Sequence, residues 1–443
     1  MAYSVGMVSL GCVKNQVDGE MVMATLKNAG YEVKDDAALA DVALINTCGF
    51  IQEAKQESIE EILELAKLKK EGRIKAIIVT GCLAERYQAE VMEELPEVDA
   101  VVGIGGNKEI ADVVKDVLEG KRTSLFPPKT ELPLCGERIP TTPSYFAYLK
   151  IAEGCDNRCT YCAIPLIRGG YRSRTMESIL EEAETLVKDG AKELILVAQD
   201  TSRYGKDLYG RLMLPELLNG LCKLDGLRWI RLLYCYPDFI TEELLDTIAR
   251  QDKVVKYIDL PLQHCSKRVL KAMNRRGSRE ELLALIRRMR GKIPNLVLRT
   301  TLITGFPGET EEEFNELAEF VKEARFERLG CFAYSQEEGT PAALLPDQLE
   351  EDVKRRRMEI IMEQQMRIME EYEESQVGKT LQVLTEGFDR YAECFFGRSY
   401  ADSPDIDGKV FFTTKGKKPP FGKFVKVKID EAMDGDLMGE IVG

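Results

Sequence analysis

The sequence predicts an α/β protein in three parts: an N-terminal doubly wound parallel α/β domain, a central partial TIM-like (βα)6 barrel, and a small C-terminal antiparallel β-barrel. Residues 3–103 and 146–334 each alternate strand-like and helix-like runs, the order typical of parallel sheets covered by helices. After residue 376, short alternating strand-like runs are separated by Gly, Pro and Asp, as in small barrels. A chain of 443 residues is long enough for two or three such domains.

In the first domain, mainly apolar strands alternate with helices of 3.6-residue periodicity. The expected strands are Tyr3–Leu10, Asp41–Thr47, Ile74–Thr80 and Asp99–Gly103. The expected helices are Val17–Asn28, Ile51–Lys70 and Ala84–Leu95. We place this domain at 1–122 and a linker rich in Pro and Thr at 123–143.

The central domain is placed at 144–375, where six strand–helix units of about thirty residues each predict the partial barrel. The expected strands are Ala147–Ala152, Glu193–Ala198, Trp229–Tyr234, Tyr257–Leu262, Val297–Ile303 and Gly330–Tyr334. Helices are expected between them, for example at Met176–Asp189 and Arg279–Gly291. A final helix, Asp352–Ser375, opens with the basic run 354–357, which we interpret as the solvated face of a helix packed on the barrel.

The last domain is placed at 376–443. Its expected strands are Leu381–Thr385, Tyr391–Phe396, Gly408–Phe412, Phe424–Ile429 and Met438–Val442. Ten Lys and Arg stand against eleven Asp and Glu in this domain, so it is nearly neutral. A dedicated RNA-binding module is expected to be clearly basic, which makes nucleic acid at most a secondary partner.

The composition limits the possible functions. The formal net charge of −14 argues against binding nucleic acid with the whole surface and fits a basic protein partner. No apolar run reaches the length of a membrane span, and the N-terminus does not resemble a signal peptide, so we expect a cytoplasmic protein without membrane contact. The chain has a single histidine, His264, which indicates that a cofactor carries the difficult chemistry.

The stretch from Cys155 to Cys162 is the most informative motif, with thiols at positions 155, 159 and 162. This spacing lets three thiolates turn toward one point, which suits an iron–sulfur cluster that keeps one iron open. A structural zinc site would need a fourth Cys or His nearby, and none occurs in the following fifty residues. Disulfides would need an oxidising compartment, and ordinary buried thiols would not explain the spacing. The motif follows the first barrel strand, at the mouth where barrel active sites lie.

A second set of cysteines lies in the first domain. Cys12, Cys48 and Cys82 each follow the C-terminal end of an expected strand, and each has a neighbouring glycine. The carboxyl ends of parallel strands form one rim where ligands bind, so these thiols are expected to meet. Each could instead be a buried core thiol, but the three equivalent positions favour a second cluster site. Cys135, in the linker, is interpreted as incidental.

The cysteine motif with the aromatic Tyr161, on the first loop of a βα barrel, resembles the radical S-adenosylmethionine enzymes. The second cysteine set and a C-terminal domain similar to the TRAM domain narrow this resemblance to the methylthiotransferases. The likeness covers essentially the whole chain. A non-enzymatic RNA-binding protein stabilised by iron–sulfur or zinc remains an alternative of another class.

Within that family the chain is most similar to the RimO subfamily, which modifies an aspartate of protein twelve of the small ribosomal subunit. The similarity lies in three motifs, Ser9–Asn15, Val197–Gly205 and Gly397–Pro404. The MiaB type, which modifies adenosine in transfer RNA, usually has Gln-Met-Asn and Gln-Asn-Val versions of the first two, and a tRNA adenosine methylthiotransferase is the alternative. Val13 stands where Pro is frequent and Gly19 where Ser is frequent, and neither is a ligand.

The resemblance implies two 4Fe–4S clusters and S-adenosylmethionine as cofactors. The first cluster would cleave S-adenosylmethionine to a 5′-deoxyadenosyl radical, which takes a hydrogen atom from the β-carbon of the aspartate. The second would carry the methylated sulfur, with its methyl group supplied by another S-adenosylmethionine. The implied partners are the ribosomal protein as substrate and an electron donor such as flavodoxin or ferredoxin. The implied cluster ligands are Cys155, Cys159 and Cys162 for the first, and Cys12, Cys48 and Cys82 for the second.

No catalytic side chain is expected beyond the clusters. The resemblance places Tyr161 beside the adenine, and the remaining candidates for contact with S-adenosylmethionine lie at the ends of later barrel strands. Those candidates are Gln199, Asp200, Gln263, Gly305 and Glu309. His264 lies beside them, although a lone histidine is more often structural.

Overall fold

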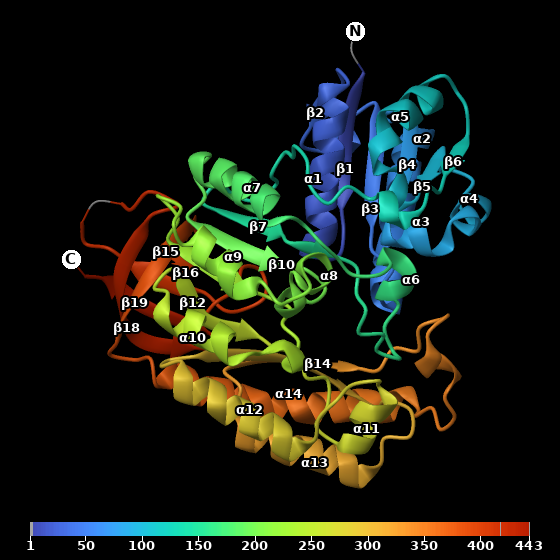
Figure 1. Ribbon diagram of the computed structural model, residues 1–443. Helices are drawn as coiled ribbons and strands as arrows, with labels where there is room; N and C mark the ends of the chain where they lie inside the picture. Colours follow the sequence, from blue (N-terminus) through green and yellow to red (C-terminus); the bar gives the residue numbers. More distant parts are fainter. Residues whose placement is uncertain (1–2, 417, 443) are drawn as a thin grey trace.

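A computed structural model describes residues 3–416 and 418–442, which fold into the three expected domains (Figure 1). The N-terminal domain has a parallel six-stranded sheet in the order β2-β1-β3-β4-β5-β6. Its strands are β1 Ser4–Ser9, β2 Glu32–Lys34, β3 Val42–Thr47, β4 Ala76–Gly81, β5 Ala100–Val102 and β6 Thr123–Leu125. Its helices are α1 Val13–Asn28, α2 Gln52–Lys70, α3 Cys82–Tyr87, α4 Ala89–Glu94 and α5 Ile110–Leu118, with 3-10 turns η1 Ala37–Leu39 and η2 Ile104–Glu109.

Successive strand residues face opposite sides of this sheet, as the two-residue period of a strand requires. In β3, Val42 and Leu44 pack with α1 and α5, whereas Ala43 and Ile45 pack with α2 and α3. Helices therefore cover both faces, and the doubly wound prediction is confirmed.

Some expected elements of this domain differ from the structure. The single helix expected at 84–95 is two helices, because Gln88 adopts a φ of +47° that interrupts the helical path. Strands β2 and β6 were not expected, and β6 lies inside the segment interpreted as linker, so the sheet extends to Leu125. Helix α1 begins at Val13 rather than Val17, which makes Cys12 its N-cap residue.

The central domain is an open parallel sheet of six strands in the order β14-β13-β12-β11-β10-β7, which confirms the partial barrel. Its strands are β7 Phe146–Lys150, β10 Glu193–Val197, β11 Trp229–Leu232, β12 Val254–Asp259, β13 Val297–Thr304 and β14 Arg328–Ala333, with a small hairpin of β8 Ala152–Glu153 and β9 Arg172–Ser173. Its helices are α6 Ile164–Arg168, α7 Met176–Lys188, α8 Lys206–Tyr209, α9 Leu214–Leu221, α10 Glu242–Arg250, α11 Lys267–Ala272, α12 Arg279–Lys292, α13 Glu311–Ala324 and α14 Glu351–Glu374. Short 3-10 turns are η3 Lys129–Glu131, η4 Thr201–Arg203, η5 Pro237–Phe239 and η6 Pro341–Leu344.

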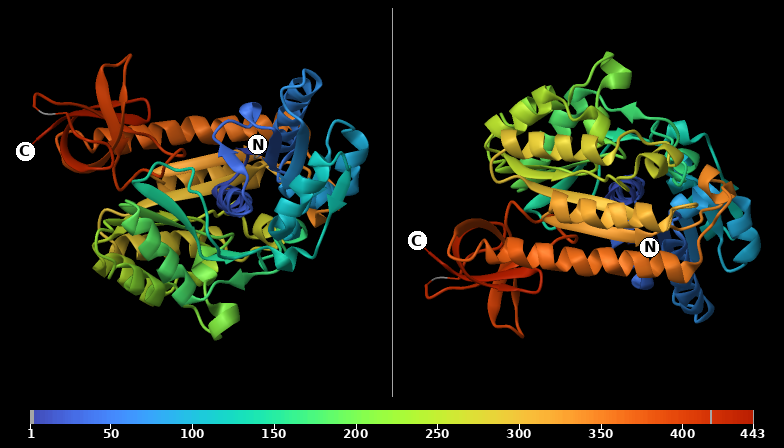
Figure 2. Two further views of the ribbon diagram at one scale, coloured as in Figure 1. Left: turned by 90° about the horizontal axis from the view of Figure 1, so that it is seen from above. Right: turned by 90° about the horizontal axis from the view of Figure 1, so that it is seen from below.

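The long helix α14 packs along β13 and β14 and extends between the small barrel and the N-terminal domain (Figure 2). From the sequence we expected the basic run at its start to form the solvated face of the helix. That expectation holds for only part of the run. Lys354 and Arg357 are buried, and Arg357 pairs with Glu309 at 2.7 Å, whereas Arg355 and Arg356 point outward. The charge pattern alone did not reveal this pairing, because Glu309 lies in a distant loop.

The C-terminal domain is a closed five-stranded barrel in the order β15-β16-β17-β19-β18. Its strands are β15 Thr380–Asp389, β16 Cys394–Arg398, β17 Val410–Thr413, β18 Phe424–Met433 and β19 Asp436–Ile441. Four of the pairings are antiparallel, but β17 and β19 run parallel, so the expected antiparallel barrel contains one parallel closure. No helix in the described parts of the chain combines the length and apolar character needed to span a membrane.

Buried ion pairs hold the small barrel against the start of the central sheet. The carboxylate of Glu193 on β10 accepts from Arg231 at 2.7 Å and from Arg398 of the small barrel at 2.8 Å. Burial alone would raise the pKa of Glu193, but Arg398 and Arg231 outweigh it and keep the pKa below its ordinary value. Arg398 belongs to the third family-like motif, so that motif joins two domains.

The substitution Glu193→Gln is expected to lower the free energy of unfolding by about 3 kcal/mol at neutral pH, because two buried guanidinium groups lose their shared anion. A carboxylate with a lowered pKa contributes stability above its ordinary pKa and loses it as the pH falls, so the difference from wild type should shrink in acid. Denaturant unfolding followed across pH checks both effects. Glu184→Gln, which removes an exposed partner of Lys188, should change stability by less than about 0.5 kcal/mol, and an equal loss would contradict the assignment.

Candidate functional site

Three cysteines of the N-terminal domain meet at one edge of its sheet. Cys12 follows β1 and caps α1, Cys48 follows β3, and Cys82 begins α3 directly after β4. Strands β1, β3 and β4 are neighbours in the sheet, so their carboxyl ends lie side by side. The structure thus brings together the three residues that the sequence predicted to converge.

The glycines beside these cysteines allow the close approach. A Cβ atom on Gly11 would lie 2.8 Å from Sγ of Cys48, and Gly11 has a φ of +84° that disfavours other residues. A Cβ atom on Gly49 would meet the backbone nitrogen of Leu83 at 2.8 Å. The three cysteine loops are therefore packed against one another through glycine.

The barrel cysteines, Cys155, Cys159 and Cys162, lie on the loop between β8 and α6. The loop is fixed to the other side of the barrel mouth, because Thr160 donates from its backbone nitrogen to Met273 at 3.1 Å and from Oγ1 to Ala272 at 2.8 Å. The side chain of Asn274 also donates to the carbonyls of Asn157 and Arg158. All three thiols of this loop are half-buried and free.

Across residues 3–416 and 418–442, no three His, Cys, Asp or Glu side chains converge closely enough to hold a single metal ion. In a 4Fe–4S cluster each thiolate binds a different iron, so its ligands lie farther apart than those of one ion. Burial raises the pKa of the Cys82 thiol to about 12, against the opposing effect of Arg168, and that of Cys155 to about 11. Metal binding must therefore displace these protons.

The two cysteine sets lie on either side of one contact between domains. Cys82 packs against Ala163 and Ile167 of the segment that directly follows Cys162. Helix α3 of the N-terminal domain therefore rests on α6 of the barrel. This contact fixes the position of one cysteine set relative to the other.

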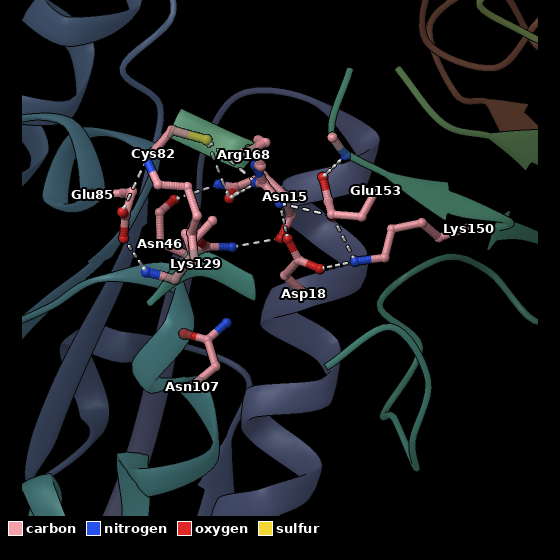
Figure 3. Close-up of polar contacts among 12 residues, drawn as sticks. Asn15, Asp18, Asn46, Cys82, Glu85, Asn107, Lys129, Lys150, Glu153 and Arg168 are labelled. Atoms are coloured by element: carbon pink, nitrogen blue, oxygen red, sulfur yellow. Dashed lines mark hydrogen bonds and ion pairs between the residues drawn. The ribbon is translucent and has the colours of Figure 1, made fainter. Parts of the chain in front are cut away.

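A buried cluster of charged residues joins the domains at the same place (Figure 3). Arg168 at the end of α6 pairs with Asp18 of α1 and with Glu153 at 3.2 Å, and Lys150 pairs with both of these acids. The other guanidinium nitrogen of Arg168 donates to Asn15 at 3.0 Å and to Sγ of Cys82 at 3.3 Å. Sequence reasoning missed this cluster, and the only available signal was charged residues within or beside apolar strands.

The residues expected near S-adenosylmethionine lie at the barrel mouth, and they differ in how many contacts hold their side chains. Tyr161 packs against a hydrophobic cluster that includes Phe306 and Tyr334. Gln199 donates to Glu153 at 2.6 Å, and Asp200 accepts from Asn157 in the cysteine loop at 3.0 Å. Gln199 and Asp200 thus connect the second barrel strand to the cluster loop.

The later strands contribute residues that are already engaged within the protein. Gln263 adopts a φ of +72° and pairs through its backbone with β13. The carboxylate of Glu309 accepts from the backbone nitrogen of Gly305 at 3.0 Å and from Arg357. His264 is fully buried 3.4 Å from Glu309, and its Nδ1 accepts from Ser266. Glu309 and His264 therefore shape the loop, and a contact of Glu309 with a cofactor stays a prediction.

Two basic side chains beside the cysteines were not singled out from the sequence. Arg275 donates to Sγ of Cys159 at 3.6 Å and lies over the ring of Tyr236. Lys14, two residues after Cys12, places its ammonium 3.4 Å from the centre of the Tyr234 ring. Burial would lower the pKa of Lys14, but Tyr234, Cys12 and Glu153 outweigh it and raise the pKa. Both side chains bring positive charge close to a cysteine of the sets.

Known protein families match the chain along most of its length. The Radical SAM superfamily matches residues 149–321, Uncharacterized protein family UPF0004 matches residues 4–103, and the TRAM domain matches residues 377–442. These matches fall on the barrel, the N-terminal domain and the small barrel respectively.

Curated relatives match nearly the full chain. Ribosomal protein uS12 methylthiotransferase RimO of Thermoanaerobacter sp. (strain X514) is 52% identical over 438 residues, which cover 99% of each chain. The protein of the same name from Lachnoclostridium phytofermentans is 50% identical over 433 residues, which cover 98% of each. The solved structure of the radical S-adenosylmethionine methyltransferase TsrM from Kitasatospora setae aligns at a TM-score of 0.59 and 16% identity, covering 78% of this chain and 77% of that one. At that identity the structural likeness shows the fold alone.

Proposed function

Because this chain belongs to the ribosomal protein uS12 methylthiotransferase family, we propose that it attaches a methylthio group to the β-carbon of an aspartate in uS12. The observation that supports the proposal is the packing of Cys82 against the segment that directly follows Cys162, which brings the domains of the two cysteine sets into contact. A transfer of sulfur needs a sulfur donor and a hydrogen-abstracting centre near the same carbon atom. The two sets offer one site for each.

The donor sets fit two 4Fe–4S clusters, each with one iron left open for another ligand. Three free thiols on one short loop and three on adjacent strand ends provide six soft ligands, and basic side chains donate to a sulfur in each set. When bound, the barrel cluster would supply the electron that cleaves S-adenosylmethionine, and the N-terminal cluster would carry the methylated sulfur that is transferred. The proposed ligands are Cys155, Cys159 and Cys162 in the barrel, and Cys12, Cys48 and Cys82 in the N-terminal domain.

The chain's own residues position the reaction and exclude water. Tyr161 closes one side of the barrel mouth, while Gln199 and Asp200 fix the second strand to the cysteine loop. We assign S-adenosylmethionine to the space these residues border, with the backbone of Gly305 and Gln263 on the far side. A side-chain base is not needed, because the carbon–hydrogen bond to be broken is not usefully acidic.

Modification of transfer RNA is the weaker candidate. It would use the same cysteines, but relatives that match 98–99% of the chain carry the uS12 name. The net charge of −14 and the nearly neutral small barrel also favour a basic protein as partner. The TRAM match leaves nucleic acid a possible second contact. We further propose that the enzyme works in the cytoplasm, where ribosomes assemble, with flavodoxin or ferredoxin as electron donor.

The experiment is mass spectrometry of uS12 and of bulk tRNA from a host strain that lacks its own methylthiotransferase of this type, with and without this gene. We expect uS12 to gain the mass of one methylthio group on an aspartate only when the gene is present, while tRNA is unchanged. A methylthio group gained by adenosine in tRNA, with uS12 unmodified, would overturn the substrate assignment.

A further inference from the structure

Lys14 is a buried cation beside Cys12, where the N-terminal domain contacts the barrel. It lies in the first turn of α1, two residues after Cys12, and is only 6% exposed. Its ammonium lies over the ring of Tyr234, a residue that follows β11 at the barrel mouth. The backbone of Tyr234 is held by Asp259 at 2.9 Å and Thr201 at 3.0 Å, so the ring is a fixed part of the mouth.

Lys14 differs from the other buried cations of the protein. Within the described parts of the chain eleven Lys and Arg side chains are buried, and nine have a carboxylate within 4 Å. Those nine are Lys55, Lys150, Arg168, Arg174, Arg231, Arg328, Lys354, Arg357 and Arg398. Arg275 instead donates to Cys159 and to the carbonyl of Pro261.

For Lys14, no hydrogen bond or ion pair joins the ammonium to any residue of 3–416 or 418–442; the Tyr234 ring is its contact. Glu153 influences it from beyond ion-pair distance, but that carboxylate is already shared by Lys150 and Arg168. With only an aromatic ring in contact, this buried ammonium keeps its N–H donors available for an arriving anion.

We propose that the ammonium of Lys14 binds the side-chain carboxylate of the target aspartate and so selects an acidic residue as substrate. This inference rests on the proposed function. The β-carbon to be modified is bonded directly to that carboxylate and must be reachable from both cysteine sets. Lys14 extends from beside Cys12 to Tyr234 at the barrel mouth, so its ammonium spans the contact of the domains that carry the two sets.

The test compares two peptides binding to the anaerobically prepared holoenzyme, measured by fluorescence anisotropy. One peptide contains the uS12 aspartate identified by mass spectrometry, and the other has Asn in its place. A charge-assisted contact predicts that the wild type binds the Asp peptide about ten- to a hundredfold more tightly. Lys14→Met is expected to bind both peptides within about twofold, and Lys14→Arg to keep most of the preference.

Lys27→Met is the matched control, because Lys27 lies on the same helix but is exposed, and it should keep the wild-type preference. Iron content and the absorption spectrum verify loading, and Lys14→Gln replaces Lys14→Met if the latter does not load. The inference would be overturned if a variant without the Lys14 charge still preferred the Asp peptide. It would equally be overturned if such a variant bound both peptides as the wild type does and differed only in its cluster potential. Equal binding of both peptides by a wild type that modifies uS12 would refute the role of Lys14 and leave the function standing. If the enzyme did not modify uS12 at all, both the role of Lys14 and the proposed function would be refuted.

Discussion

Replacing Cys155, Cys159 and Cys162 together by alanine is expected to abolish reductive cleavage of S-adenosylmethionine. The bound iron should fall from about eight to about four atoms per chain, because one of two four-iron clusters loses its protein ligands. Iron analysis, sulfide analysis and detection of 5′-deoxyadenosine check this result on protein prepared without oxygen. The effect is large because no other thiol lies on the barrel loop that could replace these ligands.

The complementary variant replaces Cys12, Cys48 and Cys82. It should also hold about four iron atoms, but it should still cleave S-adenosylmethionine while losing methylthio transfer, since the two functions belong to different sets. Cys135→Ala is the matched control, because this thiol is exposed in the segment between the domains and outside both sets. If the second variant kept about eight iron atoms, the N-terminal set would not be a cluster site.

The positions of the cysteines at the sheet edge could be predicted from the sequence, because each position depends on the strand that directly precedes it. Cys12, Cys48 and Cys82 each follow a recognisable apolar strand, and parallel topology alone brings such positions to one edge. The short strands β2 and β6 could not be predicted in the same way, since three residues carry too little periodicity.

Contacts between elements that are far apart in the sequence could not be predicted. The expected packing of α14 on the barrel is confirmed, but Lys354 and Arg357 of its basic run are buried, whereas we expected the run on the solvated face. In the sequence, Lys14 could be noticed only as a member of the motif Ser9–Asn15. Its isolation from carboxylates is a property of three-dimensional packing, because its neighbour Tyr234 is more than two hundred residues away in the chain.

Arg168 shows how strongly one such contact is expected to matter. Its guanidinium connects Asp18 of the N-terminal domain with Glu153 of the barrel and also donates to Cys82 (Figure 3). Arg168→Met would leave Asp18 and Glu153 with Lys150 as their one ion-pair partner among the described residues. Breaking a buried pair in this way costs about 3–5 kcal/mol, so the variant should unfold at lower denaturant concentration. Hydrogen exchange should also rise across α1 and α6, where the domains meet.

The midpoint potential of the N-terminal cluster distinguishes the effect of Arg168 on the cysteine thiolate from its effect on the stability of the fold. A hydrogen bond to a ligating sulfur stabilises the reduced cluster, so Arg168→Met should make the midpoint potential of the N-terminal cluster more negative. Lys at position 168 would keep the charge and restore part of the stability, but its single ammonium cannot span Asp18, Glu153 and Cys82 as the guanidinium fork does. Arg172→Met is the matched control, because Arg172 donates to the carbonyls of Lys129 and Thr130 and forms no ion pair with residues 3–416 or 418–442. A stability loss in Arg168→Met no larger than in Arg172→Met would mean that the buried cluster does not hold the two domains, and hence the two cysteine sets, together.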